Sequence, residues 1–276
     1  MRRRTTAMIG SVVALAGVAG CASAKNVTPV TVTVFQTPRT PSTTAAPTPT
    51  AAGTSGCEKS PVLAIDPGHN PTEIDDYDTQ TGVLMRDYPN GAEGQDVMDV
   101  ATGVKNRLEK AGYTVVLLKK SVDESINYRD RVDRAEQAHA DLAISLHTDI
   151  DNHKVFVQRV GLYREGAGQD GTEKRVTYTA AATAAKSQRM GEAFAAARSK
   201  VEGQPVVVTD NSFDGRAPLW GGNIPVIELI STKVPWVYNE FGTATAGGSE
   251  PIGDAGIATY TDSVVAGVRA ALPKCR

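Results

Sequence analysis

Residues 61–69 read Pro61-Val62-Leu63-Ala64-Ile65-Asp66-Pro67-Gly68-His69, an apolar run that leads directly into a polar turn. A short apolar run that stops at Asp-Pro-Gly is typical of a buried strand followed by a loop. The histidine then stands where the predicted strand gives way to the loop. This stretch therefore predicts a core strand that is followed by a histidine, His69, whose imidazole could serve in a binding or catalytic site.

Beyond this stretch, segments with helical spacing of apolar residues alternate with short apolar or β-branched runs. Helices are predicted at 96–110, 128–138, 180–201 and 258–272, and strands at 113–118, 142–146, 155–163, 206–208 and 225–230. The alternation predicts an α/β fold, a single domain with a twisted, mostly parallel sheet and helices on both faces. Ligands in such folds bind at the carboxyl ends of the strands.

The composition excludes several classes of function. The 276 residues include 29 Lys and Arg against 31 Asp and Glu, and 5% are aromatic. Without a large basic field, nucleic acid is not expected as a partner. No run reaches the roughly 18 consecutive apolar residues that a membrane-spanning helix needs. We expect a monomer.

The first 20 residues have the pattern of a lipoprotein signal peptide. Arginines at positions 2–4 precede an apolar run at 8–19, and Val18-Ala19-Gly20-Cys21 resembles a bacterial lipobox. In that motif the cysteine is acylated and becomes the new N-terminus, so we expect lipidated Cys21 to tether the exported protein to a membrane surface. The alternative is an ordinary signal peptide that is cut near residues 22–24.

A linker is expected at 21–56, where Thr and Pro are too dense for a packed core and favour extended, solvated backbone. The folded domain is then 57–276. Cys57 and Cys275 bracket this domain, and export makes a disulfide between them plausible, with two free thiols as the alternative.

Two of the four histidines directly follow predicted buried strands, His69 after 61–65 and His147 after 142–146. A hydrolytic zinc site uses three protein ligands, commonly histidines with a carboxylate, and leaves one position open for water. The carboxylate candidates lie at the start of the first helix: Glu93, Asp96 and Asp99. The residue pattern alone does not select among them.

The sequence gives weaker indications that other residues belong to the site. Glu228 lies in the apolar segment 225–230, and because burying an unpaired carboxylate is costly, we expect it to face a cleft rather than the core. An outward-pointing strand residue is the alternative. His139 and His153 are expected to be structural. Trp220 lines either the cleft or the core, and the acidic stretch 73–78 either borders the groove or is simply solvated.

The chain resembles the zinc-dependent N-acetylmuramoyl-L-alanine amidases of the amidase-3 type in four segments that follow the order of the family. These are 62–69, the acid Glu93 before a long helix, 140–147 and 225–229. The resemblance covers nearly the whole predicted domain. It implies that Zn²⁺ is held by His69, Glu93 and His147, and that Glu228 is the catalytic carboxylate, which activates a zinc-bound water. It also implies a structural role for Arg131.

The implied substrate is peptidoglycan, cleaved at the amide between N-acetylmuramic acid and L-alanine of the stem peptide. A lipid anchor on the outer face of the cytoplasmic membrane would make the domain face that cell wall. The sequence departs from the family pattern at 70–71 and 148–149, which follow the two histidines, and at 229–231, which follow Glu228, but no ligand is lost. Two alternatives remain, a catalytically silent binding module of the same fold and a zinc peptidase that acts on another amide.

Overall fold

The structure is a computed structural model, and it describes residues 57–209, 221–222 and 225–275. These residues belong to one unit, which spans Thr54–Arg276. The expected signal peptide, linker and lipidated Cys21 lie outside the described residues, and so does Trp220. Within the described part of the chain, no helix has both the length and the apolar character that crossing a membrane would require.

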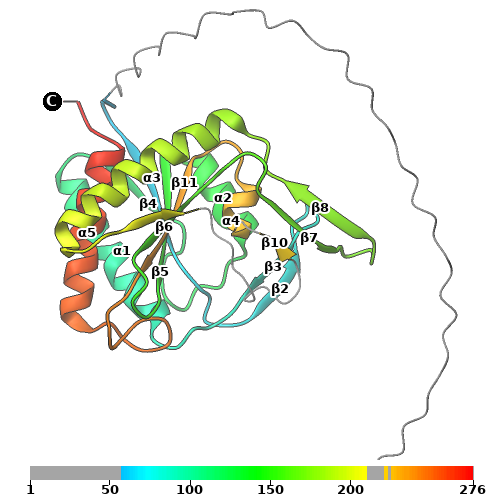
Figure 1. The fold of residues 1–276 in the computed structure, drawn as a ribbon, viewed down its shortest axis with the longest axis horizontal. Coiled ribbons are helices and arrows are strands. Elements are labelled where there is room, and N and C mark those ends of the chain that lie inside the picture. The colour runs from blue at the N-terminus through cyan, green and yellow to red at the C-terminus, as the bar shows by residue number, and fades with distance from the viewer. Residues whose placement is uncertain (1–56, 210–220, 223–224, 276) are drawn as a thin grey trace, which may run out of the picture. The chain divides into compact units, whose positions relative to one another are not determined.

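A six-stranded sheet runs through the centre of the domain in the order β4-β1-β5-β11-β6-β9 (Figure 1). Its strands are β4 (Thr114–Leu117), β1 (Val62–Pro67), β5 (Leu142–Thr148), β11 (Trp236–Phe241), β6 (Lys154–Val157) and β9 (Val207–Thr209). The first four are parallel to one another, and β6 runs antiparallel to β11. The carboxyl ends of β1, β5 and β11 therefore meet at the same edge of the sheet.

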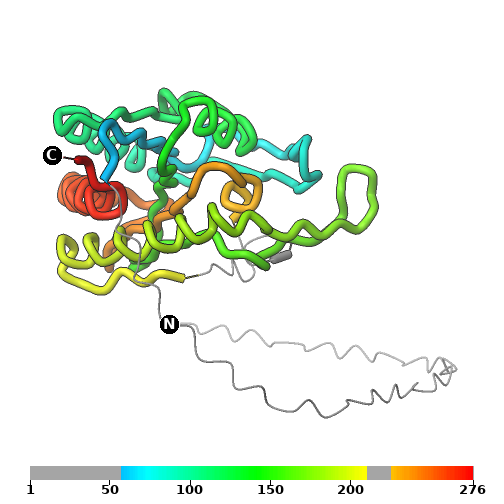
Figure 2. Tube along the Cα trace, turned by 90° about the horizontal axis from the view of Figure 1, so that it is seen from above, coloured from blue at the N-terminus to red at the C-terminus, as the bar shows by residue number. Residues whose placement is uncertain are grey.

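Helices cover both faces of this sheet, as predicted (Figures 1 and 2). One apolar core joins the sheet to α1 (Glu93–Lys110), α3 (Ala181–Glu202) and α5 (Gly253–Ala271). A second core on the other face contains residues of α2 (Tyr128–Gln137) and α4 (Val226–Ile230). Strands β1 and β5 are almost fully buried because both of their faces are covered.

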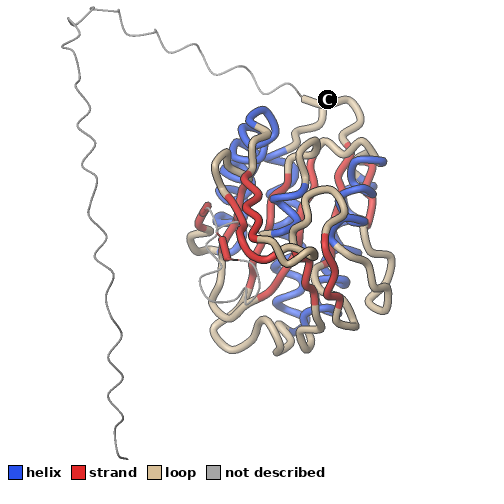
Figure 3. Tube along the Cα trace, turned by 90° about the vertical axis from the view of Figure 1, so that its right-hand side faces the viewer, coloured by secondary structure: helices blue, strands red, loops and turns tan. Residues whose placement is uncertain are grey.

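Two small sheets flank the main one (Figures 1 and 3). A hairpin of β2 (Ile74–Tyr77) and β3 (Leu84–Asp87) lies between β1 and α1 in the chain. The other small sheet contains β7 (Tyr163–Ala167), β8 (Glu173–Thr177) and the two-residue strand β10 (Gly221–Gly222). The acidic stretch 73–78 is thus mostly strand β2.

The two ends of the domain are joined by a disulfide between Cys57 and Cys275, which confirms the prediction. Backbone hydrogen bonds reinforce this junction: Glu58 N donates to Pro273 O at 2.9 Å, and Cys275 N donates to Glu58 O at 2.8 Å. Structural disulfides are typical of proteins that fold outside the cytoplasm. The bridge therefore agrees with export.

Several predicted elements need correction. The predicted strand 225–230 is instead mostly the short helix α4 (Val226–Ile230), and the strand that lies beside β5 is β11, which was not predicted. The predicted strand 155–163 divides into β6 and the start of β7. Helices α1 and α5 begin earlier than expected, at Glu93 and Gly253. A six-residue apolar run fits a buried helix turn as well as a buried strand, because it is too short for its periodicity to distinguish them.

Candidate metal centre

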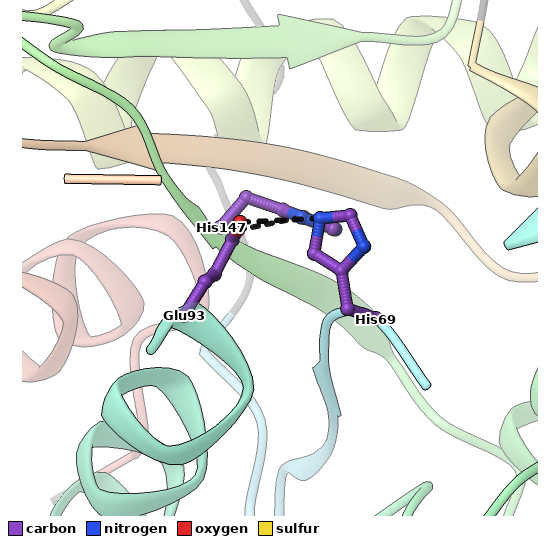
Figure 4. A group of neighbouring side chains, drawn as sticks. All are labelled: His69, Glu93 and His147. Atoms are coloured by element: carbon purple, nitrogen blue, oxygen red, sulfur yellow. Dashed lines mark hydrogen bonds and ion pairs between the residues drawn. The ribbon is translucent and has the colours of Figure 1, made fainter. Parts of the chain in front are cut away.

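Three side chains from separate parts of the chain meet at the carboxyl end of the sheet: His69, Glu93 and His147 (Figure 4). One potential ligand atom from each residue lies within 4.8 Å of the others. His69 follows β1, Glu93 begins α1, and His147 lies near the end of β5. The family resemblance implied this set of residues, whereas the residue pattern alone left the carboxylate open among Glu93, Asp96 and Asp99.

The His69 ring is oriented by its Nδ1 atom, which lies 2.8 Å from the carbonyl oxygen of Tyr88. A carbonyl only accepts hydrogen bonds, so Nδ1 must carry the proton, and Nε2 is the nitrogen that can bind a metal. Nε2 lies 3.1 Å from Glu93 Oε2. Burial opposes the charged ring, but the hydrogen bonds and charges of Asp87 and Glu93 outweigh it and raise the pKa of His69 to about 10.

Glu93 is the first residue of α1, where the partial positive charge of the helix N-terminus favours an anion. Its Oε1 accepts a hydrogen bond from the Thr148 backbone N–H at 2.8 Å and lies 3.0 Å from His147 Nδ1. The Asn90 side-chain amide donates to Oε2. Burial acts to raise the pKa of Glu93, but the hydrogen bonds and charges of the two histidines hold it well below its usual range.

The His147 ring is buried between the ring of Tyr238 and the backbone of Gly68. On one side it stacks on Tyr238, with ring centroids 4.3 Å apart and the planes tilted by 13°. On the other side lies Gly68, where an added Cβ would come within 2.3 to 2.6 Å of the ring atoms. Burial lowers the pKa of His147, although its contact with Glu93 opposes the shift. This ring is therefore neutral at pH 7, the form that binds metals.

A buried ionic network lies behind His69. Arg131 NH1 donates to Asp66 Oδ1 at 2.8 Å, and Arg131 NH2 donates to Asp87 Oδ2 at 2.9 Å. Asp87 Oδ1 in turn lies 3.3 Å from His69 Nδ1, and Ser145 Oγ donates to Asp66 at 2.7 Å. The structural role expected of Arg131 is confirmed. Asp87 and Asp66 were not predicted as parts of the centre, since no sequence spacing links them to it.

The remaining candidates have other partners. Asp96 accepts a hydrogen bond from the Ile252 backbone N–H at 2.9 Å, and Asp99 accepts one from Gln95 at 2.8 Å. His139 occupies a left-handed turn with a φ of 52°, and His153 pairs with Glu202 at 2.6 Å. The group that could hold a metal among the described residues includes none of these four.

Glu228 lies inside α4 with its side chain almost fully buried. Neither carboxylate oxygen has a hydrogen-bond partner among the described residues. Burial raises the pKa of the Glu228 carboxyl well above its ordinary value, and the backbone of Tyr238 opposes this shift only in part. The backbone carbonyl of Glu228 accepts a hydrogen bond from Gln158, and the Gln158 side chain also receives the N–H of Trp236, at the amino end of β11.

A second buried glutamate, Glu240, was missed in the sequence. It lies near the carboxyl end of β11, in direct register with His147 on β5. Tyr238 stacks on His147, and residues two apart on a strand point to the same face, so Glu240 projects from the face of the sheet that carries His147. The signal that could have found it is a carboxylate in an apolar run, Trp236-Val237-Tyr238-Asn239-Glu240-Phe241, that stops at Gly242.

The donor set fits a catalytic zinc ion. Two imidazoles and one carboxylate are a known ligand combination for hydrolytic zinc, and they leave a fourth position open for water. The nitrogen of His69 that faces Glu93 is the one left free by its hydrogen bond to Tyr88. The residues present therefore match the chemistry of the expected metal.

Comparisons with known proteins identify the family of this chain. A model of the Amidase_3 family, described as N-acetylmuramoyl-L-alanine amidase, matches residues 63–244. A comparison with curated protein sequences finds no match.

Solved structures with a similar chain include the N-acetylmuramyl-L-alanine amidase of Mycobacterium smegmatis, which is 14% identical, with a TM-score of 0.48, over 79% of this chain and 99% of that one. Another is the catalytic domain of an N-acetylmuramoyl-L-alanine amidase from Bacillus (Paenibacillus) polymyxa, which is 18% identical, with a TM-score of 0.44, over 76% and 95%. A third, from Clostridium difficile 630, is 16% identical, with a TM-score of 0.47, over 76% and 96%. The family model covers well over half of the sequence and includes all three residues of the metal centre, and the chain belongs to the Amidase_3 family of N-acetylmuramoyl-L-alanine amidases.

Proposed function

We propose that this peptidoglycan amidase is a zinc enzyme that hydrolyses the amide between N-acetylmuramic acid and L-alanine of the stem peptide. The observation that carries the proposal is the convergence of His69, Glu93 and His147 at the carboxyl end of the sheet. These three residues would hold the zinc ion, which would supply Lewis-acid chemistry by lowering the pKa of a bound water and polarising the scissile carbonyl. The three ligands fix the position of the reaction.

Catalysis also needs a carboxylate that takes a proton from the attacking water and passes it to the departing amine. Glu228 is our sequence-based proposal for this role. Its support is a buried carboxyl whose oxygens have no hydrogen-bond partner among the described residues and whose pKa is raised. A raised pKa makes a carboxylate a stronger base, which favours its taking a proton from the attacking water.

Glu240 is a second candidate for the same role, and the strand register favours it. Glu240 lies in direct register with His147. The backbone of Glu228, by contrast, lies beside Trp236, because the Gln158 side chain hydrogen-bonds to the backbones of both residues. Four residues of strand separate Trp236 from Glu240, which is about 13 Å. The carboxyl of Glu228 lies near the backbone of Tyr238, two residues before Glu240 on the strand.

The test is digestion of purified peptidoglycan by the full-length protein, with mass spectrometry of the products and elemental analysis of bound metal. We expect free stem peptides and peptide-free glycan, and loss of both after treatment with a chelator. Glu228→Gln and Glu240→Gln are compared with the exposed surface variant Glu192→Gln as the control. The variant that keeps its zinc but loses turnover identifies the base, and full activity of Glu228→Gln removes Glu228 from this role.

The same digestion separates the two alternatives. A silent binding module would hold peptidoglycan without releasing any peptide, and a peptidase would cut the stem peptide while leaving alanine on the glycan. The complete donor set favours an enzyme over a silent module, because it supplies the three protein ligands that a hydrolytic zinc site uses.

We further propose that Cys21 is lipidated and that residues 21–56 link this anchor to a catalytic domain at 57–276, on the outer face of the cytoplasmic membrane. The support is the lipobox-like sequence together with a disulfide that agrees with export. Membrane fractionation tests it: the wild-type protein should stay with the membrane, and Cys21→Ser should not. Release of the wild-type protein into the medium would contradict the proposal.

A further inference from the structure

The backbone of His69 has an uncommon conformation. Its φ is 56°, in the left-handed region that residues with a side chain rarely occupy. Such a conformation persists only when the surrounding structure holds it. For a metal ligand the requirement is strict, because a change in this backbone would turn the imidazole away from Glu93 and His147.

Two buried cations hold that backbone. The carbonyl oxygen of His69 accepts a hydrogen bond from Lys119 Nζ at 2.6 Å and one from Arg131 NH2 at 3.3 Å. Lys119 Nζ also lies 3.3 Å from the carbonyl oxygen of Gly68, the residue against which the His147 ring packs. The ammonium group of Lys119 thus contacts the backbone of one histidine ligand, His69, and the backbone of Gly68, which packs against the other, His147.

Lys119 is an unusual lysine. It lies two residues after β4 and is almost fully buried, a situation in which lysine is seldom found unless it is paired. Asp66 and Asp87 provide opposite charge nearby. The hydrogen bonds of Nζ nevertheless go to the two backbone carbonyls, and the carboxylates of Asp66 and Asp87 bond to Arg131. A lysine kept only for charge balance would bond to the carboxylates.

We propose that Lys119 is a positioning residue for the metal centre: its ammonium group fixes the left-handed backbone of His69 and the adjoining Gly68, and so sets the spacing of the ligands. The inference rests on the proposed binding of zinc at His69, Glu93 and His147. Groups that orient metal ligands from behind typically contribute roughly 10–100-fold to metal affinity. We expect an effect of that size here.

The experiment compares zinc affinity in full-length wild type, Lys119→Met, Lys119→Gln, Lys119→Arg and Lys120→Met, by competition with a chelator of known affinity. Lys120 is the matched control, because it is the next residue and is exposed. Absorption spectra of the Co²⁺-loaded proteins report ligand geometry, and thermal unfolding without metal reports stability. The spectrum and the affinity are readouts that a purely structural role would leave unchanged.

We expect Lys119→Met and Lys119→Gln to bind zinc roughly 10–100-fold more weakly and to show an altered Co²⁺ spectrum. Lys119→Arg should restore most of the affinity, because a guanidinium can still donate to both carbonyls, and Lys120→Met should match wild type. Wild-type affinity and spectrum in Lys119→Gln would overturn the inference, even if Lys119→Met fails to fold. Loss of stability with unchanged affinity would overturn it too. If wild type itself binds no zinc, it is the proposed function that fails.

Discussion

Replacing Gly68 by alanine tests how tightly the metal centre is built. The new Cβ would lie 2.3 Å from the nearest atom of the His147 ring, whereas carbon atoms in good contact are roughly 3.5–4.0 Å apart. The ring must therefore move by about 1 Å or more. It cannot move directly away, because Tyr238 stacks on its other side with a centroid distance of 4.3 Å. Metal sites require ligand distances within about 0.2 Å of their ideal values, so this displacement exceeds the tolerance several-fold.

We therefore expect Gly68→Ala to lose most of its zinc affinity, and overpacking to cost about 1–3 kcal/mol of unfolding free energy. Chelator competition measures the affinity, and denaturant unfolding of the metal-free protein measures the stability. Gly94→Ala is the matched control: it lies in α1 beside Glu93, and its Cβ would meet only Val122 Cγ2, at 3.8 Å. Wild-type zinc affinity in Gly68→Ala would refute the packing argument for His147.

The other predictions concern protons, the ionic network and the disulfide. Because the pKa of His69 is raised to about 10, the ring is protonated at pH 7 in the metal-free protein, and zinc must displace that proton. Calorimetry in buffers of different ionisation enthalpy should show release of about one proton, and the apparent affinity should rise about tenfold per pH unit up to the pKa of His69; a pH-independent affinity would contradict this. Arg131→Met leaves Asp66 and Asp87 buried without their cation, so we expect a loss of about 3–5 kcal/mol of unfolding free energy, and a denaturation midpoint equal to that of wild type would disprove the assigned role. The disulfide joins residues 218 apart, so Cys57→Ser with Cys275→Ser should lower the unfolding free energy by roughly 2–5 kcal/mol, measured by urea unfolding; an unfolding free energy equal to that of wild type would contradict this.

The sequence predicted the parts of the fold that carry a strong local signal. The apolar runs of β1 and β5 are buried on both faces, and their ends deliver His69 and His147 to the same edge of the sheet. Glu93 could not be separated from Asp96 and Asp99 by pattern alone, since all three acids lie near one helix start. The family resemblance selected Glu93, and the structure agrees.

Other features could not be predicted because they depend on contacts between distant residues. The segment 225–230 and β11 have similar apolar content, and only their packing makes the first a helix and the second the strand beside β5. Glu240 has a local signal, a carboxylate in an apolar run, but only the fold shows that it lies in register with His147. The contacts of Lys119 with the backbone of His69 span 50 residues of sequence and leave no local pattern.

The central claim is that His69, Glu93 and His147 together hold one metal ion. A crystal of the zinc-loaded protein, measured on both sides of the zinc absorption edge, tests it directly through the anomalous difference density. We predict one strong peak in contact with His69 Nε2, a carboxylate oxygen of Glu93 and a ring nitrogen of His147. A peak at any other place, or none at these three side chains, would contradict the account.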